Sequence, residues 1–212
     1  MLLHDYWRSG ASYRVRLALN LKNLVFDQMP HDLRTDAQTD PGYVAINPQE
    51  LVPALEADGQ VLTQSLAIIE WLEEKHPAPA LLPADPNSRA VVRAMASLIA
   101  CDIHPLHNLR VLTALRHEIG ASEAQVSGWI AHWIKDGLAA LETMIVRHGG
   151  IYAFGDTPGL VDCCLVPQLY SAERFTVPLG AFPRVVAAGA AARALPAFAA
   201  AHPYRQPDAD AR

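Results

Sequence analysis

The chain has few cysteines and few basic residues, and each shortage excludes a class of protein. Its 212 residues include three cysteines, Cys101, Cys163 and Cys164. An odd number with two adjacent members fits neither a disulfide framework nor a structural zinc site. Lysine and arginine number 17 against 22 aspartates and glutamates, which gives a formal net charge of −5. We therefore expect no nucleic-acid partner, because neutralising phosphates requires a basic surface.

Long hydrophobic runs and targeting signals are also missing. No uninterrupted apolar stretch reaches the ~18 residues that cross a bilayer, so we expect no membrane partner. The first ten residues, MLLHDYWRSG, lack a basic region followed by an apolar one, so we expect no signal peptide. Hydrophobic residues make up 51% and charged residues 18%, a composition typical of folded rather than disordered chains. These features favour a soluble, globular protein of a reducing, cytoplasmic compartment.

The first 80 residues alternate short strands with helices. The pattern predicts the order β-α-β-α-β-β-α, and its strongest element is an amphipathic helix over 65–75. Asp58–Gly59 is typical of a hairpin turn between the last two strands. The other expected elements are strands within 1–7, 24–29, 51–55 and 61–62, and helices within 12–23 and 31–41.

A proline-rich stretch separates this part from a helical one. Because prolines between 76 and 86 stop any helix, we expect an N-terminal domain over 1–80, a linker over 81–87 and an all-helical domain over 88–212. The expected helices cover 88–116, with a break at His104–Pro105, then 123–147 and 160–175, and the alanine-rich stretch 187–201 is expected to be helical packing material. Residues 205–212 are expected to form a frayed tail.

Two junctions between a loop and a helix are candidate anion sites. Ser9 lies where the first strand gives way to a helix, and Gln64–Ser65 opens the helix over 65–75. A helix N-terminus favours an anion because its N–H groups are unpaired and it carries a partial positive charge. Simple capping of each helix is the alternative. Between the two, the proline-interrupted run 51–55 indicates an edge that can pair with an extended peptide.

Taken together, these residues resemble a known family. Ser9, Val52–Pro53 and Gln64–Ser65, followed by a helical second half, are similar to the glutathione transferases. More narrowly, the chain resembles the zeta class, which contains glutathione-dependent maleylacetoacetate and maleylpyruvate isomerases. The segments that carry this resemblance are WRSGASYRVRLAL (7–19), INPQELVPAL (46–55), LTQSLAIIEWLEE (62–74), LLPADP (81–86) and CDIHPLHNLRVL (101–112). The resemblance covers essentially the whole chain, and implies an α/β thioredoxin-like N-terminal domain followed by an all-α C-terminal domain.

The resemblance also implies a role for each matching residue. Ser9 would stabilise the glutathione thiolate, and Arg8, Arg110 and Arg174 would bind substrate carboxylates; the alternative for each arginine is a solvated surface position. Asp102 would reach the glutathione of a partner subunit, which implies a homodimer. The residues implied to bind glutathione are Ser9, Gln49, Val52, Pro53 in a cis peptide, Gln64, Ser65, Asp102, His104 and Asn108.

Three positions depart from the family pattern. Gly10–Ala11 stands where the zeta class usually has Ser-Cys, so a cysteine there is not required for chemistry. His107 stands where bacterial isomerases often have asparagine, and its role is open. Gly159 stands where the family usually has a Ser or Thr N-cap for the helix expected over 160–175. Glycine at this position lowers the stability of the helix by only a few tenths of a kcal/mol. His104 and His107 are spaced to share a metal ion, but no third ligand follows at a suitable spacing, and we expect no metal.

The implied chemistry is nucleophilic catalysis on a conjugated cis double bond. A thiolate that adds to this bond leaves a single bond free to rotate, and its departure restores the double bond in the trans form. Lowering a thiol pKa by about two units takes about 2.7 kcal/mol. A hydrogen bond from Ser9 to the charged sulfur supplies ~1.5–3 kcal/mol, and the helix N-terminus adds ~0.3–1 kcal/mol.

Other functions remain open from the sequence alone. A transferase that conjugates small electrophiles with glutathione is one alternative, and a non-catalytic glutathione-binding or protein-interaction relative is another. Maleylacetoacetate and maleylpyruvate differ by one methylene, which a pocket discriminates by only ~1–3 kcal/mol. The segment 108–112 slightly favours maleylacetoacetate, and so tyrosine rather than other aromatic catabolism.

Overall fold

The computed structural model describes residues 1–210. The chain forms two compact units. The first unit combines Met1–Leu81 with the residues from Ala194 onward, and the second is Leu82–Arg193. The sequence analysis instead assigned all of 88–212 to one helical domain. The difference arises because Arg16 and Asn20 of the first helix donate hydrogen bonds to the carbonyls of Ala201 and Ala197. These bonds secure the C-terminal helix to the first unit.

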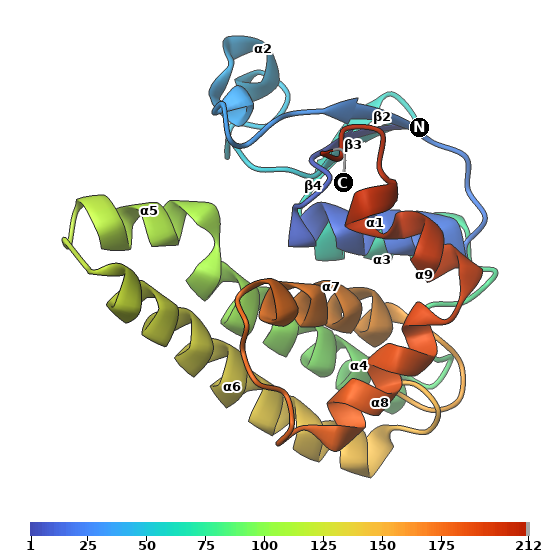
Figure 1. Ribbon diagram of the computed structural model, residues 1–212. Helices are drawn as coiled ribbons and strands as arrows, with labels where there is room; N and C mark the ends of the chain where they lie inside the picture. Colours follow the sequence, from blue (N-terminus) through green and yellow to red (C-terminus); the bar gives the residue numbers. More distant parts are fainter. Residues whose placement is uncertain (211–212) are drawn as a thin grey trace. The chain divides into compact units, whose positions relative to one another are not determined.

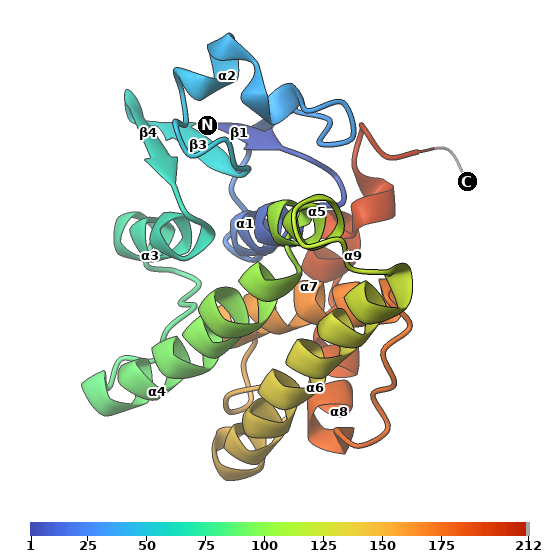
Figure 2. The ribbon, with the colours of Figure 1, turned by 90° about the vertical axis from the view of Figure 1, so that its left-hand side faces the viewer.

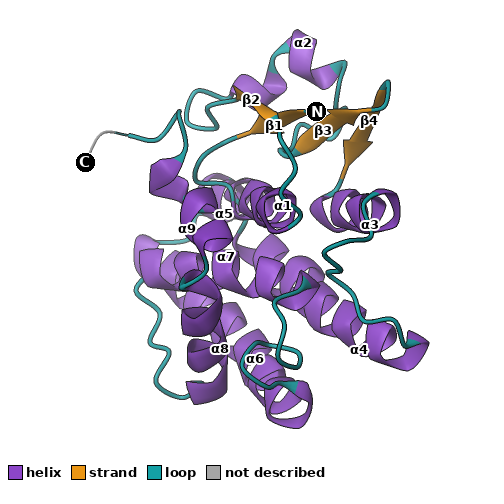
Figure 3. Ribbon diagram, turned by 90° about the vertical axis from the view of Figure 1, so that its right-hand side faces the viewer, coloured by secondary structure: helices purple, strands orange, loops and turns teal. Residues whose placement is uncertain are grey.

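A four-stranded mixed sheet forms the centre of the first unit (Figure 1). Its strands lie in the order β2-β1-β3-β4 (Figure 3). Strand β1 pairs in parallel with β2 and antiparallel with β3, and a turn at Asp58–Gly59 joins β3 to β4. The strands are β1 (Leu2–Asp5), β2 (Asp27–Pro30), β3 (Ala54–Ala57) and β4 (Gln60–Thr63). The predicted element order and the predicted hairpin are confirmed.

Two helices, α1 (Gly10–Leu21) and α3 (Ser65–Lys75), lie side by side on one face of this sheet (Figure 3). Helix α1 is buried along most of its length, including Arg16, which pairs with Asp5 at 2.7 Å where neither side chain is more than 1% exposed. The shorter helices of the unit are α2 (Pro41–Val44) after a 3-10 turn at Ala37–Thr39, and α9 (Pro196–Ala201) followed by a 3-10 turn at Pro203–Arg205.

The prediction of a frayed tail over 205–212 is wrong for the part that the structure describes. Gln206 is buried, Asp208 accepts a hydrogen bond from the backbone of Trp7, and Asp210 pairs with Arg34. The segment is ordered because its polar side chains find partners far away in the chain. The predicted fraying of 211–212 falls outside the described residues.

The second unit is helical, as expected (Figure 2). Its helices are α4 (Pro86–Ser97), α5 (Leu109–His117), α6 (Glu123–His148), α7 (Leu160–Arg174) and α8 (Pro183–Arg193). Helix α7 forms its centre, contacts α4 and α8, and buries Cys163 and Cys164. Among residues 1–210, no helix is both long and apolar enough to cross a membrane.

Two breaks interrupt the helices that the sequence predicts. The helix expected over 88–116 passes through a π-helical turn, Leu98–Ile103, and a 3-10 turn, His104–His107, before α5 begins. Pro105 lies in this break, as predicted, because it lacks the N–H that a continuous helix needs. The alanine-rich stretch is split into α8 and α9, because Pro196 begins a new helix.

Candidate functional site

Ser9 is the N-cap residue of α1. Its Oγ accepts a hydrogen bond from the N–H of Ser12 at 3.2 Å, and its own backbone is extended. The capping alternative weighed from the sequence is therefore present in the structure. Capping uses a lone pair of the Ser9 oxygen and leaves the hydroxyl proton available. No residue within 1–210 accepts a hydrogen bond from that proton. The half-buried hydroxyl can cap the helix and still donate to an anion at the helix N-terminus.

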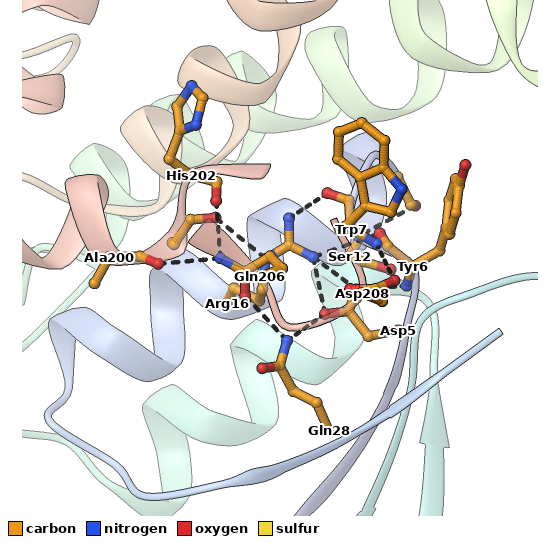
Figure 4. Close-up of polar contacts among 12 residues, drawn as sticks. Asp5, Tyr6, Trp7, Ser12, Arg16, Gln28, Ala200, His202, Gln206 and Asp208 are labelled. Carbon is orange, nitrogen blue, oxygen red and sulfur yellow. Dashed lines mark hydrogen bonds and ion pairs between the residues drawn. The ribbon is translucent and has the colours of Figure 1, made fainter. Parts of the chain in front are cut away.

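The loop that carries Ser9 is fixed through its backbone (Figure 4). The N–H of Tyr6 donates to Oδ1 of Asp5 at 2.7 Å, and the C=O of Trp7 accepts from Nη2 of Arg16 at 2.9 Å. The N–H of Trp7 donates to Oδ2 of Asp208 at 2.9 Å. Arg16 is therefore a structural residue, buried and paired with Asp5. Arg8 follows Trp7 with its guanidinium 5.4 Å from the indole centroid, half-buried beside Ser9.

A second loop presents Val52 at the edge of the sheet. The peptide bond between Val52 and Pro53 is cis, as the resemblance implies. Pairing of β3 begins only at Ala54, and the N–H and C=O of Val52 make no hydrogen bond to any of residues 1–210. The structure therefore leaves a backbone donor and acceptor that an extended peptide can pair with.

Two buried residues hold this loop in place. The hydroxyl of Tyr43 and Nδ2 of Asn47 both donate to the C=O of Leu51, each at 2.6 Å, and Oδ1 of Asn47 accepts from the N–H of Gln49 at 3.1 Å. Burial raises the pKa of Tyr43 to about 12, so its hydroxyl remains a donor at neutral pH. The sequence analysis missed Tyr43 and Asn47; an asparagine before proline in a turn was the available signal for Asn47.

Gln64 and Ser65 lie at the N-terminus of α3. Gln64 has a φ of 68°, a left-handed conformation that costs a non-glycine residue about 1–3 kcal/mol. Its Nε2 donates to Oε1 of Gln49 at 2.9 Å, so the two predicted glutathione-binding amides meet. Ser65 is buried, and its Oγ accepts from Nη1 of Arg14 at 3.2 Å. The first unit thus brings together a helix N-terminus, two amides and an unpaired backbone edge.

The predicted residues of the second unit lie on its two irregular turns and at nearby helix ends. Asp102 is exposed on the π-helical turn, and Asn108 is the N-cap of α5, accepting from the N–H of Arg110 at 3.4 Å. Arg110 is exposed on the first turn of α5. Arg174, at the end of α7, stacks its guanidinium 4.4 Å from the centroid of the Phe175 ring.

His104 and His107 contact one another. The rings of His104 and His107 lie edge to face with centroids 5.6 Å apart. His107 is buried, and its Nε2 lies 3.3 Å from Oε1 and 3.2 Å from Nε2 of Gln168. This amide on α7 is therefore a hydrogen-bonding partner of the His107 ring. Within residues 1–210, no group of three or more side chains is arranged to hold a metal ion.

Comparisons with known proteins extend over the whole chain. The family model for the N-terminal domain of glutathione S-transferase matches residues 3–80. Maleylacetoacetate isomerase of Pseudomonas aeruginosa is 53% identical over 214 residues, covering all of both proteins. The holo structure of a maleylpyruvate isomerase, a bacterial zeta-class glutathione S-transferase, is 48% identical with a TM-score of 0.97, over 99% of this chain and 100% of that one.

A further solved structure has ligands in its site. Maleylacetoacetate isomerase of Methylobacterium extorquens AM1, with bound malonate and glutathione, is 39% identical with a TM-score of 0.95 and full coverage of both chains. Full-length identity at these levels, together with the sheet, helices and cis proline described above, extends well beyond a shared fold. The chain belongs to the glutathione transferase family, in its zeta class of maleylacetoacetate and maleylpyruvate isomerases.

Proposed function

We propose that the protein catalyses the glutathione-dependent cis–trans isomerisation of a maleyl dioxo dicarboxylic acid. The products would be fumarylacetoacetate from maleylacetoacetate or fumarylpyruvate from maleylpyruvate, a step in the breakdown of tyrosine or other aromatic compounds. The observation that carries the proposal is the Ser9 hydroxyl at the N-terminus of α1, with a proton left to donate. Full-length relatives bearing isomerase names support it.

The residues present in the first unit fit glutathione. Glutathione is an extended peptide, and the unpaired N–H and C=O of Val52 suit its backbone. Its γ-glutamyl carboxylate is an anion, and the N-terminus of α3 at Gln64–Ser65 suits an anion. Gln49, hydrogen-bonded to Gln64, adds a further polar group to the same place.

When bound, glutathione supplies a thiolate nucleophile for the conjugated double bond. Ser9 would donate its hydroxyl proton to that sulfur, and the partial positive charge at the N-terminus of α1 would favour the ionised form. Together these two effects supply ~2–4 kcal/mol, enough to lower a thiol pKa by at least one unit. Ser9 and α1 therefore suffice, and no general base is needed beside the sulfur.

The substrate carries two carboxylates, and arginine side chains are suited to bind them. A guanidinium offers two parallel N–H donors to a carboxylate, which fixes both position and orientation. We propose this role for Arg8 on the first unit and for Arg110 and Arg174 on the second. Asp102, His104 and Asn108 are proposed to contribute to the glutathione and substrate region, as in the zeta class.

We further propose a homodimer in which the exposed Asp102 reaches the glutathione bound by a partner subunit. Sedimentation should then give about twice the chain mass, and an Asp102→Ala variant should weaken glutathione binding without unfolding the chain. A cytoplasmic location follows from the same chemistry, because the cofactor must be kept as a reduced thiol.

The proposal is tested by following maleylacetone and maleylpyruvate by absorbance, with and without glutathione, while free thiol is titrated. Trans product at constant thiol supports an isomerase, and the ratio of kcat/KM values identifies the preferred substrate. Loss of thiol without isomerisation supports the alternative of a conjugating transferase. Glutathione binding with neither signal supports a non-catalytic relative.

A further inference from the structure

The end of the chain contacts the loop that carries Ser9. Oδ2 of Asp208 accepts a hydrogen bond from the N–H of Trp7 at 2.9 Å, although the two residues are 201 positions apart (Figure 4). Trp7 lies two residues before Ser9 in the loop between β1 and α1. The same loop closes on itself, because the N–H of Ser9 donates to the C=O of Tyr6 at 2.9 Å. Asp208 therefore binds within the turn that places Ser9.

The other side chains that hydrogen-bond to the backbone of Tyr6 and Trp7 come from the elements that flank the loop. Asp5 ends β1 and Arg16 lies within α1, and they bond to the backbone of Tyr6 and Trp7 while forming a buried ion pair. Asp208 adds a hydrogen bond to the backbone of the loop from a remote part of the chain. A strand and a helix alone leave the loop between them a range of conformations, and a third anchor narrows that range.

The segment around Asp208 is itself firmly attached. Gln206 is buried, and its Nε2 donates to the carbonyls of Ala200 and His202 at 3.0 and 2.9 Å. Its Oε1 accepts from Nε2 of Gln28 at 3.0 Å, and that nitrogen also donates to Oδ2 of Asp5 at 2.7 Å. Asp208 is thus held next to the same buried carboxylate that fixes the start of the loop.

The neighbouring Ala209 packs where the two loops of the site meet. It packs against a hydrophobic cluster formed by Tyr6, Trp7, Tyr43 and Val52. This cluster joins the loop of Ser9 to the loop whose Val52 backbone is proposed to pair with glutathione. Residues 206–209 therefore bind the Ser9 loop through Asp208 and pack, through Ala209, against the cluster that links this loop to the Val52 loop.

We propose that residues 206–209 support the glutathione site, and that Asp208 is a positioning residue for Ser9. This inference rests on the proposed function, since Ser9 must act on the glutathione sulfur. A hydrogen bond to a thiolate weakens steeply with distance and angle, so a loop released by loss of Asp208 stabilises the thiolate less well. If Asp208 only supported the fold, its replacement would leave the pKa of the bound glutathione thiol unchanged.

The test compares Asp208→Ala with Asp208→Asn, whose Oδ1 can still accept from Trp7. The matched control is Asp210→Ala, which removes an exposed pair with Arg34 in the same segment. For each folded variant, the pKa of bound glutathione is read from thiolate absorbance, alongside its affinity by calorimetry, kcat/KM and the melting temperature. We expect Asp208→Ala to raise the thiol pKa by about one unit and lower kcat/KM about tenfold.

Asp208→Asn and Asp210→Ala should both remain within about twofold of the unmodified protein. A lower melting temperature for Asp208→Ala, with the thiol pKa and kcat/KM unchanged, would overturn the positioning role. If the unmodified protein binds glutathione without isomerising either substrate, the proposed function fails. The thiol pKa of bound glutathione still tests the contact between Asp208 and the Ser9 loop in that case.

Discussion

Ser9 has two tasks, because one hydroxyl caps α1 and is also proposed to stabilise a thiolate. Ser9→Ala removes both, so we expect kcat to fall at least tenfold and stability to fall by about 1 kcal/mol. Ser122→Ala is the matched control, since Ser122 caps α6 in the same way and is exposed in the second unit. It should reproduce the loss of stability and leave kcat unchanged. Steady-state kinetics and urea unfolding of both variants measure the two effects separately.

Unchanged turnover in Ser9→Ala, at full saturation with glutathione, would contradict the role given to the hydroxyl. The N-terminus of α1 would then be the remaining source of thiolate stabilisation. A fall in kcat of equal size in Ser122→Ala would show that the loss in Ser9→Ala reflects stability alone.

At the scale of elements, a buried lysine joins the end of α1 to the end of α3. Nζ of Lys22 lies 2.7 Å from Oε2 of Glu73 and also donates to the carbonyls of His76 and Pro79 at 2.7 and 2.9 Å. Lys22→Met leaves Glu73 buried without its cation, and we expect a loss of about 3–5 kcal/mol in the free energy of unfolding. Lys75→Met breaks an exposed pair with Asp58 and should cost under ~1 kcal/mol.

Urea unfolding of the two lysine variants measures this difference. Equal losses would mean that the Lys22–Glu73 pair contributes no more than a surface contact. A larger loss in Lys75→Met would contradict the account of how α1 and α3 are held together.

Helix α7 begins with a buried carboxylate that gives the second unit a pH dependence. Asp162 accepts hydrogen bonds from the N–H groups of Ala153 and Gly159, but burial raises its pKa to about 6. The folded chain then binds this proton more tightly than the unfolded chain. Its contribution to stability is therefore fully present below about pH 4 and is lost as the pH rises through about 6.

Asp162→Asn isolates this contribution, because asparagine does not titrate. The stability of the unmodified protein relative to Asp162→Asn should decrease by about 2–3 kcal/mol between pH 4 and pH 6. Urea unfolding at intervals of half a pH unit measures it. A relative stability that increases over the same range would contradict the raised pKa.

The elements that the sequence predicts well are those specified by neighbouring residues. The helix over 65–75 begins and ends where its apolar period does, and Pro105 marks a real break. The prediction that the tail after 205 is frayed is wrong, because the partners of its side chains, Trp7 and Arg34, lie near the other end of the chain. No local pattern distinguishes Asp208 from a solvated carboxylate.

The same reasoning applies to the site. Ser9, Val52–Pro53 and Gln64–Ser65 form short motifs next to strand ends and helix starts, so the sequence reveals them. Tyr43 acts through the carbonyl of Leu51, a contact that exists only after folding. Residues proposed to bind a ligand through local motifs can thus be identified in the sequence, whereas residues that position them through remote contacts cannot.

At the scale of the whole molecule, the reactivity of the three cysteine thiols measures how well the core of the second unit excludes solvent. Cys101 is exposed, whereas Cys163 and Cys164 are buried in α7. We expect a thiol reagent to modify one cysteine per native chain quickly, and all three in denaturant. Rapid modification of all three without denaturant would mean that α7 is not the closed centre of the second unit. Mass spectrometry of the labelled chain identifies the residue.

The central claim is that glutathione is regenerated in each catalytic cycle. The most direct test supplies glutathione at one hundredth of the substrate concentration and follows product and free thiol together. The account predicts conversion of nearly all substrate to the trans isomer with free thiol unchanged. Conversion that stops after one product per glutathione, with the thiol consumed, would contradict it and leave a conjugating transferase as the function.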